Sequence, residues 1–209
     1  MASKKGARID NNPQALNAKI TIRRNVLAAI GANAAVFDAF AGTGRMYAEV
    51  WKDAGYYTGC DVKPQADSRL MFCADNRRVM RAIDLQRFAI FDLDAYGSPW
   101  EQAIIIADRR PVAPGELLGL VLTEGQALSF RYGEIPYAMA PLVGIKPGKG
   151  TVVGLSRQSD RLIELALNGL MKRMRCGIEK RWEARVPART GVIPMRYIGL
   201  VLRGARDLR

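Results

Sequence analysis

Short apolar strands alternate with amphipathic helices over the first 125 residues, and this alternation constrains the fold more than any other feature of the sequence. Gly, Pro and Asp bound the strands, as expected where strands end and turns begin. Parallel strands are joined by crossovers that are usually helices, so the pattern predicts an α/β domain with a mainly parallel central sheet and helices on both faces. The predicted strands are 34–40, 56–62, 87–94 and 117–125, and the predicted helices are 13–30, 45–55, 75–83 and 99–110.

The sequence after these elements is less regular. Residues 125–158 are rich in Gly and Pro and favour neither helix nor strand. Residues 159–177 predict an amphipathic helix, with Ser159 as its N-cap and Gly177 as its stop.

The C-terminal part predicts two strands, 180–186 and 196–204, which we expect to form an antiparallel hairpin. The predicted fold is therefore a Rossmann-like α/β domain that ends in this hairpin. We expect residues 1–12 to form a flexible basic arm and residues 13–209 to form one domain, because a chain of this length suits one substantial core.

The composition limits the chemistry. The sequence has no histidine, so Ser-His and Cys-His nucleophile pairs are excluded and a metal site is not expected. Carboxylates, backbone groups and a bound cofactor remain as the means of catalysis. Three cysteines without CxxC spacing are typical of reduced thiols in the cytoplasm, and no apolar run approaches the roughly 20 residues of a membrane span.

The net charge of +12 predicts a polyanionic partner, most simply nucleic acid. Arg and Lys gather at 172–185, where Trp182 is interleaved, and at 203–209, and Arg23 with Arg24 adds to the positive charge. A structural role on an acidic assembly is the alternative interpretation of this charge.

The stretch "VFDAFAGTGR", residues 36–45, predicts a strand that turns on glycines into a helix. Such a turn brings backbone N–H groups and a helix N-terminus close to a ligand. The third glycine of the dinucleotide fingerprint is replaced by Tyr47, which disfavours an NAD-dependent enzyme. The stretch resembles motif I of class I S-adenosylmethionine-dependent methyltransferases. This resemblance implies an S-adenosyl-L-methionine site that includes Asp38, Phe40, Gly42 and Gly44, whereas the alternative is a packing turn without a ligand.

Two further acids fit the order of the same family. Asp61 in "GCDVKP" ends the next predicted strand, where an acidic residue can accept hydrogen bonds from ribose hydroxyls. The resemblance implies this role for Asp61 and a contact with the cofactor adenine for Asp75 in "FCADNRR". The alternatives are a carboxylate that caps a turn at Asp61 and a helix N-cap at Asp75.

The stretch "FDLDAYGSPW", residues 91–100, places Asp92 and Asp94 at the end of a strand that runs into a tight turn. It resembles "DLDPYGSP" of the tRNA guanine-26 N2-dimethyltransferase family, with Ala95 in place of proline. The resemblance implies that Asp94 and Tyr96 are catalytic: the carboxylate accepts an N–H of a base amine, and the ring stacks on the base. Asp92 is assigned to the cofactor site. The alternative is a pair of strand-end acids satisfied by helix N-termini and a nearby arginine.

Together these motifs predict an S-adenosylmethionine-dependent N-methyltransferase that acts on an exocyclic base amine in nucleic acid. RNA, with a tRNA-like guanine, is favoured over DNA. One alternative is a DNA adenine-N6 or cytosine-N4 methyltransferase of the phage or restriction type, and another is an inactive nucleic-acid-binding module with the same fold. We expect the segment 125–158 and the C-terminal hairpin to read the substrate.

Overall fold

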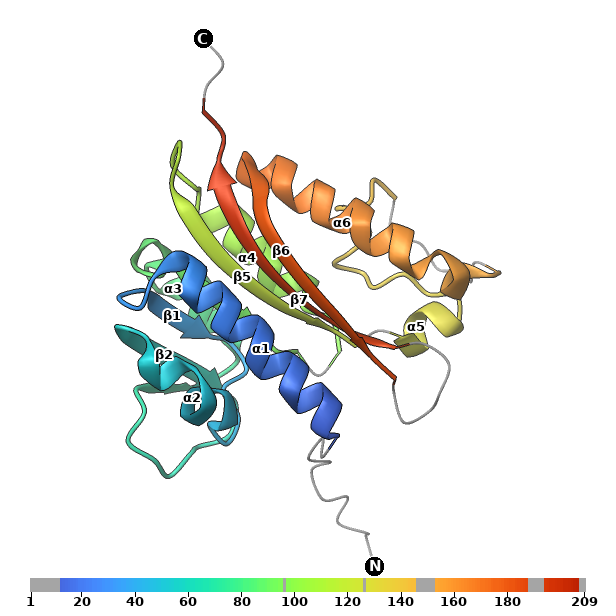
Figure 1. Cartoon of the computed structure of the whole chain (residues 1–209). Coiled ribbons are helices and arrows are strands. Elements are labelled where there is room, and N and C mark those ends of the chain that lie inside the picture. Colours follow the sequence, from blue (N-terminus) through green and yellow to red (C-terminus); the bar gives the residue numbers. More distant parts are fainter. Residues whose placement is uncertain (1–11, 96, 126, 146–152, 188–193, 207–209) are drawn as a thin grey trace, which may run out of the picture.

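The computed structural model of the protein describes residues 12–95, 97–125, 127–145, 153–187 and 194–206 (Figure 1). Of the predicted basic arm, only Asn12 is among them. Its side chain accepts a hydrogen bond from the backbone N–H of Gln14 and thereby caps the first helix. Pro13 at the first helical position suits this cap, because its missing N–H would have no partner there.

A seven-stranded sheet in the order β3-β2-β1-β4-β5-β7-β6 forms the centre of the molecule. The five strands from β3 to β5 are parallel, and β7 runs antiparallel to both β5 and β6. This arrangement confirms the mainly parallel sheet and the C-terminal antiparallel pair. The strands are β1 Ala35–Asp38, β2 Tyr56–Asp61, β3 Met71–Cys73, β4 Ile90–Leu93, β5 Leu117–Glu124, β6 Cys176–Val186 and β7 Met195–Gly204.

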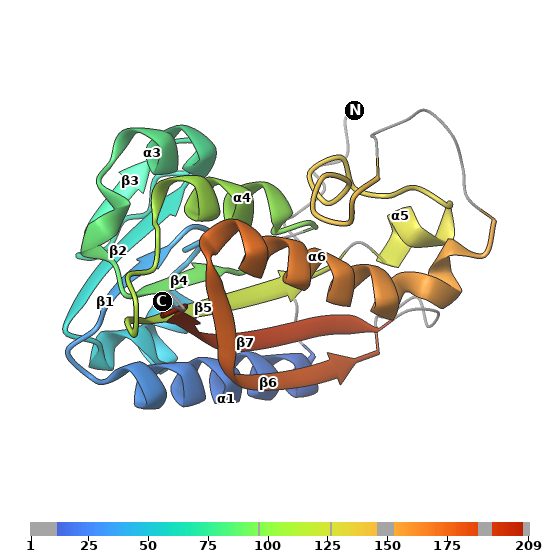
Figure 2. The same ribbon diagram turned by 90° about the horizontal axis from the view of Figure 1, so that it is seen from above.

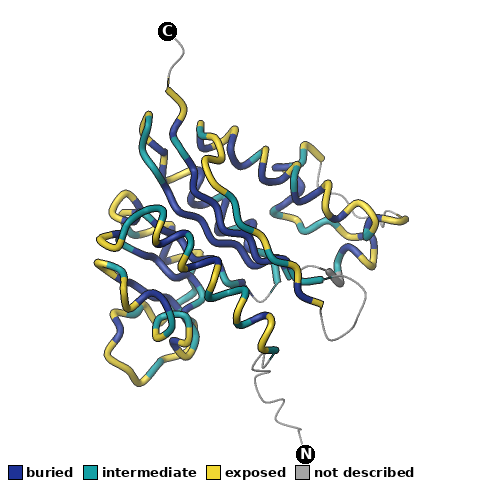
Figure 3. Tube along the Cα trace, viewed as in Figure 1, coloured by how far each residue is buried: buried dark blue, intermediate teal, exposed yellow. Residues whose placement is uncertain are grey.

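Helices cover both faces of the sheet, as predicted (Figure 2). One face carries α1 and α2, and the other carries α3, α4 and α6. The helices are α1 Pro13–Ile30, α2 Arg45–Glu49, α3 Asn76–Ala82, α4 Trp100–Arg109, α5 Ala127–Arg131 and α6 Ser159–Met174. Each face buries its own apolar core, so the central strands are buried on both sides (Figure 3).

Helix α1 packs closely on β5 and β7 because both strands have a glycine beneath it. A Cβ on Gly199 would lie 2.6 Å from Ile22 Cγ2, and one on Gly119 would lie 2.8 Å from Val26 Cγ1. The missing side chains bring the helix onto the sheet, which places the polar residues of α1 beside the strand ends.

Several details differ from the sequence predictions. The strand β3 was not predicted, since three residues are too few to show a pattern. The helix expected over 45–55 ends at Glu49 and continues as a 3₁₀ turn, Trp51–Asp53. Helix α6 has Gln158 at its N-cap position, so the predicted N-cap Ser159 is its first residue. The helix ends at Met174 and not at Gly177, because Arg175 adopts φ 52° and leads directly into β6.

Candidate active site

The parallel strands β1 and β4 are neighbours, while β2 lies on the other side of β1. Ligands of open α/β sheets bind outside the carboxyl ends of the strands at such a reversal of strand order. The glycine turn after β1 lies at this edge. Gly42 and Gly44 have φ of 45° and 85°, values that favour glycine.

Asp61, at the end of β2, holds the glycine turn. Its Oδ2 accepts a hydrogen bond of 3.0 Å from the backbone N–H of Gly42, and its Oδ1 accepts one of 2.9 Å from that of Lys63. The structure therefore brings Asp61 next to the turn, as the predicted site requires, and also gives it the turn-capping role of the alternative.

Arg69 braces the same turn from the segment between β2 and β3. Its guanidinium donates to the carbonyl oxygens of Ala41 at 3.1 Å and Gly42 at 2.9 Å, and it pairs with Asp67 at 2.6 Å. A Cβ on Gly44 would lie 2.7 Å from Arg69 Cζ, so only glycine leaves room for this brace. Arg69 was not predicted as a site residue, because no local pattern in the sequence links it to a turn more than twenty residues earlier.

Asp38 lies beneath the glycine turn and is 2% exposed. Its carboxyl accepts hydrogen bonds of 3.1 Å from the Phe40 N–H and from the Tyr57 hydroxyl. Burial, reinforced by the nearby Asp92, raises the pKa of Asp38 to about 8. Asp38 therefore holds the backbone at the start of the glycine turn through its hydrogen bond from Phe40.

Asp92 is completely buried and binds Arg23 of helix α1. The Arg23 guanidinium donates to Asp92 Oδ2 from Nε at 2.6 Å and to Oδ1 from Nη2 at 2.7 Å, while Trp51 Nε1 donates to Oδ2 at 2.8 Å. In this structure Asp92 exposes no atom to a cofactor, so the alternative of an acid paired with a nearby arginine describes it. Arg23 likewise has no exposed surface, which corrects its assignment to a basic surface.

Asp94 lies two residues further along, at the end of β4, and its side chain is 15% exposed. Lys19 Nζ lies 3.0 Å from Asp94 Oδ2, and Arg23 Nη2 lies 3.3 Å from the same oxygen. The Thr123 hydroxyl donates to Oδ1 at 2.7 Å. Burial favours the neutral carboxyl, but Arg23, Lys19 and Thr123 outweigh it and hold the pKa of Asp94 below its usual value. Asp94 is therefore an ionised acceptor at the strand edge, whereas Tyr96 lies outside the described residues.

A pocket of about 480 Å³ opens beside this edge. Its lining includes Phe40 from the glycine turn, Ala95 and Gly97 after β4, and Gln102 of α4. Gln102 Nε2 donates to Asn76 Oδ1 at 2.9 Å, and Asn76 Nδ2 donates to the Ala39 carbonyl at 2.7 Å. Gln102 Oε1 is buried and has no hydrogen-bond partner within the described part of the chain.

Asp75 caps helix α3, as the alternative interpretation predicted. Its Oδ1 accepts a hydrogen bond of 2.9 Å from the Arg77 backbone N–H. The Arg77 guanidinium also donates to the carboxylate and lowers the pKa of Asp75 to about 2. The cofactor contact of Asp75 stays a prediction.

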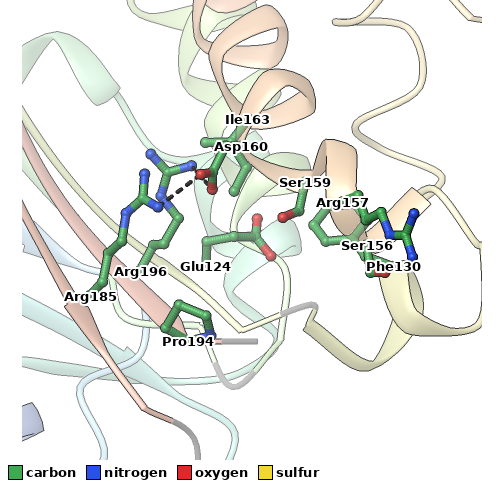
Figure 4. Close-up of a pocket in the computed structure, with 10 residues that line it drawn as sticks. All are labelled: Glu124, Phe130, Ser156, Arg157, Ser159, Asp160, Ile163, Arg185, Pro194 and Arg196. Atoms are coloured by element: carbon green, nitrogen blue, oxygen red, sulfur yellow. Dashed lines mark hydrogen bonds and ion pairs between the residues drawn. The ribbon is translucent and has the colours of Figure 1, made fainter. Parts of the chain in front are cut away.

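A second cavity, of about 170 Å³, lies further along the same edge, where β5 ends (Figure 4). Glu124 of β5 and Ser159 of α6 face this space from different elements. Asp160 pairs with Arg185 at 2.8 Å and with Arg196 at 3.2 Å on its wall. The sequence analysis did not predict this cavity, which combines residues from three separated segments.

Half of the cations in the basic stretch 172–185 are paired with acids, namely Arg173, Arg181 and Arg185. Arg181 binds Glu164 at 2.6 Å and Glu183 at 2.7 Å, so this part of β6 carries little free positive charge. The exposed cations that form no ion pair with another described residue include Arg157, Lys172, Arg175 and Lys180.

In the part of the chain that the structure describes, no group of His, Cys, Asp and Glu residues is arranged to hold a metal ion. Within the same ranges, no helix is long and apolar enough to cross a membrane.

Comparison with protein-family models and with curated proteins found no match. Solved structures do match. The N-methyltransferase NodS from Bradyrhizobium japonicum WM9, in complex with S-adenosylhomocysteine, has a TM-score of 0.56 and 13% identity, and the alignment covers 98% of this chain and 94% of NodS. TYW2 from M. jannaschii, in complex with S-adenosylmethionine, has a TM-score of 0.57 and 9% identity, with coverage of 94% and 79%.

Trm1 from Pyrococcus horikoshii, a tRNA guanine dimethyltransferase solved with S-adenosylmethionine, has a TM-score of 0.56 and 18% identity. The alignment covers 99% of this chain and 60% of Trm1. The protein therefore has the fold of class I S-adenosylmethionine-dependent methyltransferases, as the motifs predicted.

Proposed function

We propose that the protein is an S-adenosylmethionine-dependent N-methyltransferase that acts on an exocyclic base amine in nucleic acid, with RNA favoured over DNA. The observation that carries this proposal is the ionised carboxylate of Asp94, held at the end of β4 at the reversal of strand order. The glycine turn and the pocket lined by Phe40 and Ala95 lie beside it.

The residues at this edge fit the cofactor. A Cβ on Gly42 would approach only the Phe40 carbonyl oxygen, at 3.9 Å, so the turn is open on the side where a ligand approaches. Asp61 is positioned for the ribose hydroxyls, and Gln102, whose buried Oε1 has no hydrogen-bond partner within the described residues, is one of the residues that line the adjacent pocket. When bound, the cofactor supplies a methyl group that its positive sulfonium already activates.

The chain's own residues orient the acceptor. The lone pair of an exocyclic amine is conjugated with the base, so the amine needs alignment before it can attack. The Asp94 carboxylate and the Ala95 carbonyl accept its N–H bonds and aim the nitrogen at the methyl group. With the cofactor bound, the nitrogen would gain the methyl group as the carbon–sulfur bond breaks, and the N–H proton would pass to solvent during or after the transfer. The low pKa of Asp94 keeps its carboxylate an acceptor at neutral pH.

Three observations support a nucleic-acid acceptor. The net charge is +12, and the exposed cations Arg157, Lys172, Arg175 and Lys180 suit phosphate oxygens. The turn "DLDAYGSP" resembles that of tRNA guanine-26 N2-dimethyltransferases. A tRNA guanine dimethyltransferase is also among the proteins with this fold.

Methyl transfer from labelled S-adenosylmethionine into separate pools of tRNA, rRNA and DNA tests the proposal. We expect label in an RNA pool and a loss on the order of 100-fold in Asp94→Asn, with cofactor affinity retained. Asp108→Asn is the matched control, because Asp108 is an exposed carboxylate on α4 that pairs with Arg173.

The other outcomes separate the alternatives. Label in DNA alone would support the restriction-type enzyme, and equal label in wild type and Asp94→Asn would refute the role of Asp94. Cofactor binding without label in any pool would indicate another acceptor. Nucleic-acid binding without cofactor binding would support the inactive module.

A further inference from the structure

Helix α1 carries Lys19 and Arg23 one turn apart, so both side chains reach the same strand edge. The sequence assigned no site role to this helix. The Arg23 Nη1 donates to the Lys19 carbonyl at 3.1 Å, which ties the guanidinium to its own helix. The other donors of Arg23 reach Asp92 and Asp94 at the end of β4.

The contacts with Asp92 hold the Arg23 guanidinium in one position. It has no exposed surface, its two bonds to Asp92 are bidentate, and Asp92 is fixed in turn by Trp51. A guanidinium is planar and stays charged, so it presents a fixed positive group to Asp94 Oδ2. Thr123 fixes the other oxygen, Oδ1.

Lys19 approaches Asp94 from the solvent side. Its ammonium lies 3.0 Å from Oδ2, its side chain is 19% exposed, and its Nζ lies 5.7 Å from the centre of the Tyr197 ring. Unlike Arg23, it is a flexible point charge on a long stem. Its ammonium lies within hydrogen-bond distance of Oδ2, an oxygen that an acceptor amine could use in the proposed reaction.

We propose that Arg23 is a positioning residue that orients Asp94 for the acceptor amine, and that Lys19 holds the outer side of this carboxylate until the amine displaces it. This inference rests on the proposed function. In this proposal α1 supplies two residues that contact Asp94. Arg23 is buried and keeps its contact during the reaction, whereas Lys19 loses its contact when the amine binds.

The groups that face Asp94 determine how its titration responds to substitution. They are Lys19 and Arg23 from α1, Asp92 from its own strand, Asp38 from β1 and the Thr123 hydroxyl from β5. Removal of either cation leaves two acids, Asp38 and Asp92, with less opposing charge. The pKa of Asp94 is then expected to rise.

The test compares Arg23→Gln with Arg110→Gln. Arg110 is also buried and pairs with a carboxylate, Glu116, but it lies at the opposite edge of the sheet. Both variants remove the ion pair of a buried arginine and are expected to lose stability. Only Arg23→Gln is expected to lower kcat, by roughly tenfold or more, and to move the acid limb of the kcat–pH profile to higher pH. A normal kcat and an unchanged acid limb in Arg23→Gln would overturn the positioning role.

Lys19→Met tests the proposed displacement of Lys19 by the amine, and we expect it to perturb the fold less than Arg23→Gln. We expect the KM for the acceptor to fall about two- to fivefold with little change in kcat, because the amine no longer displaces an ion pair. Lys52→Met, at an exposed lysine away from the carboxylate, is the control. A KM that rises in Lys19→Met would show that this lysine binds substrate, which contradicts the displacement role.

A readout without turnover separates this inference from the proposed function. The Asp94 carboxyl is titrated by carbon NMR in wild type, Lys19→Met and, where it folds, Arg23→Gln, with Arg23→Lys as the milder substitute. If the pKa of Asp94 is higher in the variants but the wild type transfers no methyl group, the contacts of Lys19 and Arg23 with Asp94 are supported and the proposed function is refuted. An unchanged pKa would refute the inference itself.

Discussion

Two arginine–carboxylate networks stabilise this protein, and they differ in their contact with water. At the carboxyl edge of β4, the paired side chains of Arg23 and Asp92 are 1% and 0% exposed. On the C-terminal hairpin, Arg185 and its partner Asp160 are 48% and 56% exposed. The chemistry of the pairs is the same, so the difference in their consequences comes from burial.

Burial makes the first network costly to disturb, whereas in the second network water can replace the partners of the exposed Arg185. The edge network therefore fixes the position of Asp94. The hairpin network mainly neutralises β6, so much of the charge that the sequence analysis assigned to nucleic acid is already paired. This result shifts attention from the paired arginines of β6 to the unpaired Arg157, Lys172, Arg175 and Lys180.

Breaking the edge network should have the largest effect. Asp92→Ala leaves Arg23 as a buried charge without its bidentate partner, and we expect the free energy of unfolding to fall by about 3–5 kcal/mol. Urea denaturation measures this loss. A change below about 1 kcal/mol would show that Arg23 finds other partners and that the two networks are equivalent.

A smaller effect is expected from pH. The pKa of Asp38 rises on folding from its ordinary value of 3.8 to about 8, so folding takes up a proton between these values and stability falls as pH increases through this interval. Asp38→Asn removes the titrating group. Its stability relative to wild type should increase from about pH 4 to pH 8 and then stay level, at no more than about 1.4 kcal/mol per pH unit. A parallel pH dependence in both proteins would contradict this pKa shift.

The smallest effect is expected on the hairpin. Arg185→Ala removes partners of Asp160 and Glu183 that are accessible to water, and we expect a loss below about 1 kcal/mol that shrinks further in high salt. Thermal unfolding at low and high salt tests this. A loss as large as that of Asp92→Ala would remove the distinction between the two networks.

The sequence predicted the fold because its signals are local and periodic. The helix 13–30, with Gly31 after it, was predicted with its observed bounds, and the strands that carry Asp38, Asp61 and Asp92 were found from apolar runs that end in breakers. The early start of β6 was missed, because Gly177 and the exposed residues after it do not show the alternation of a half-buried strand.

The candidate site was predictable only where its residues form contiguous motifs. Gly42, Gly44 and Asp94 stand in such motifs, but their supports do not. Arg23 lies 69 positions from Asp92 in the sequence, and its neighbour Arg24 made the pair resemble a basic surface patch. Which of two adjacent arginines is buried depends on how α1 packs against the sheet, and that contact involves strands at the far end of the chain.

The packing of α1 on the sheet also determines when, during folding, Lys19 and Arg23 can reach Asp94 at the end of β4. Helix α1 packs on β7, and β7 lies between β5 and β6, so the earliest helix of the domain depends on its latest strand. During synthesis the glycine turn and Asp94 emerge long before residue 204, and such distant contacts form slowly. A nascent chain that already contains β1 to β5 holds the glycine turn and the turn after β4, yet it lacks β7, which forms part of the surface on which α1 docks. The cofactor edge can therefore form early, whereas the orientation of the acceptor carboxylate is expected among the last events of folding.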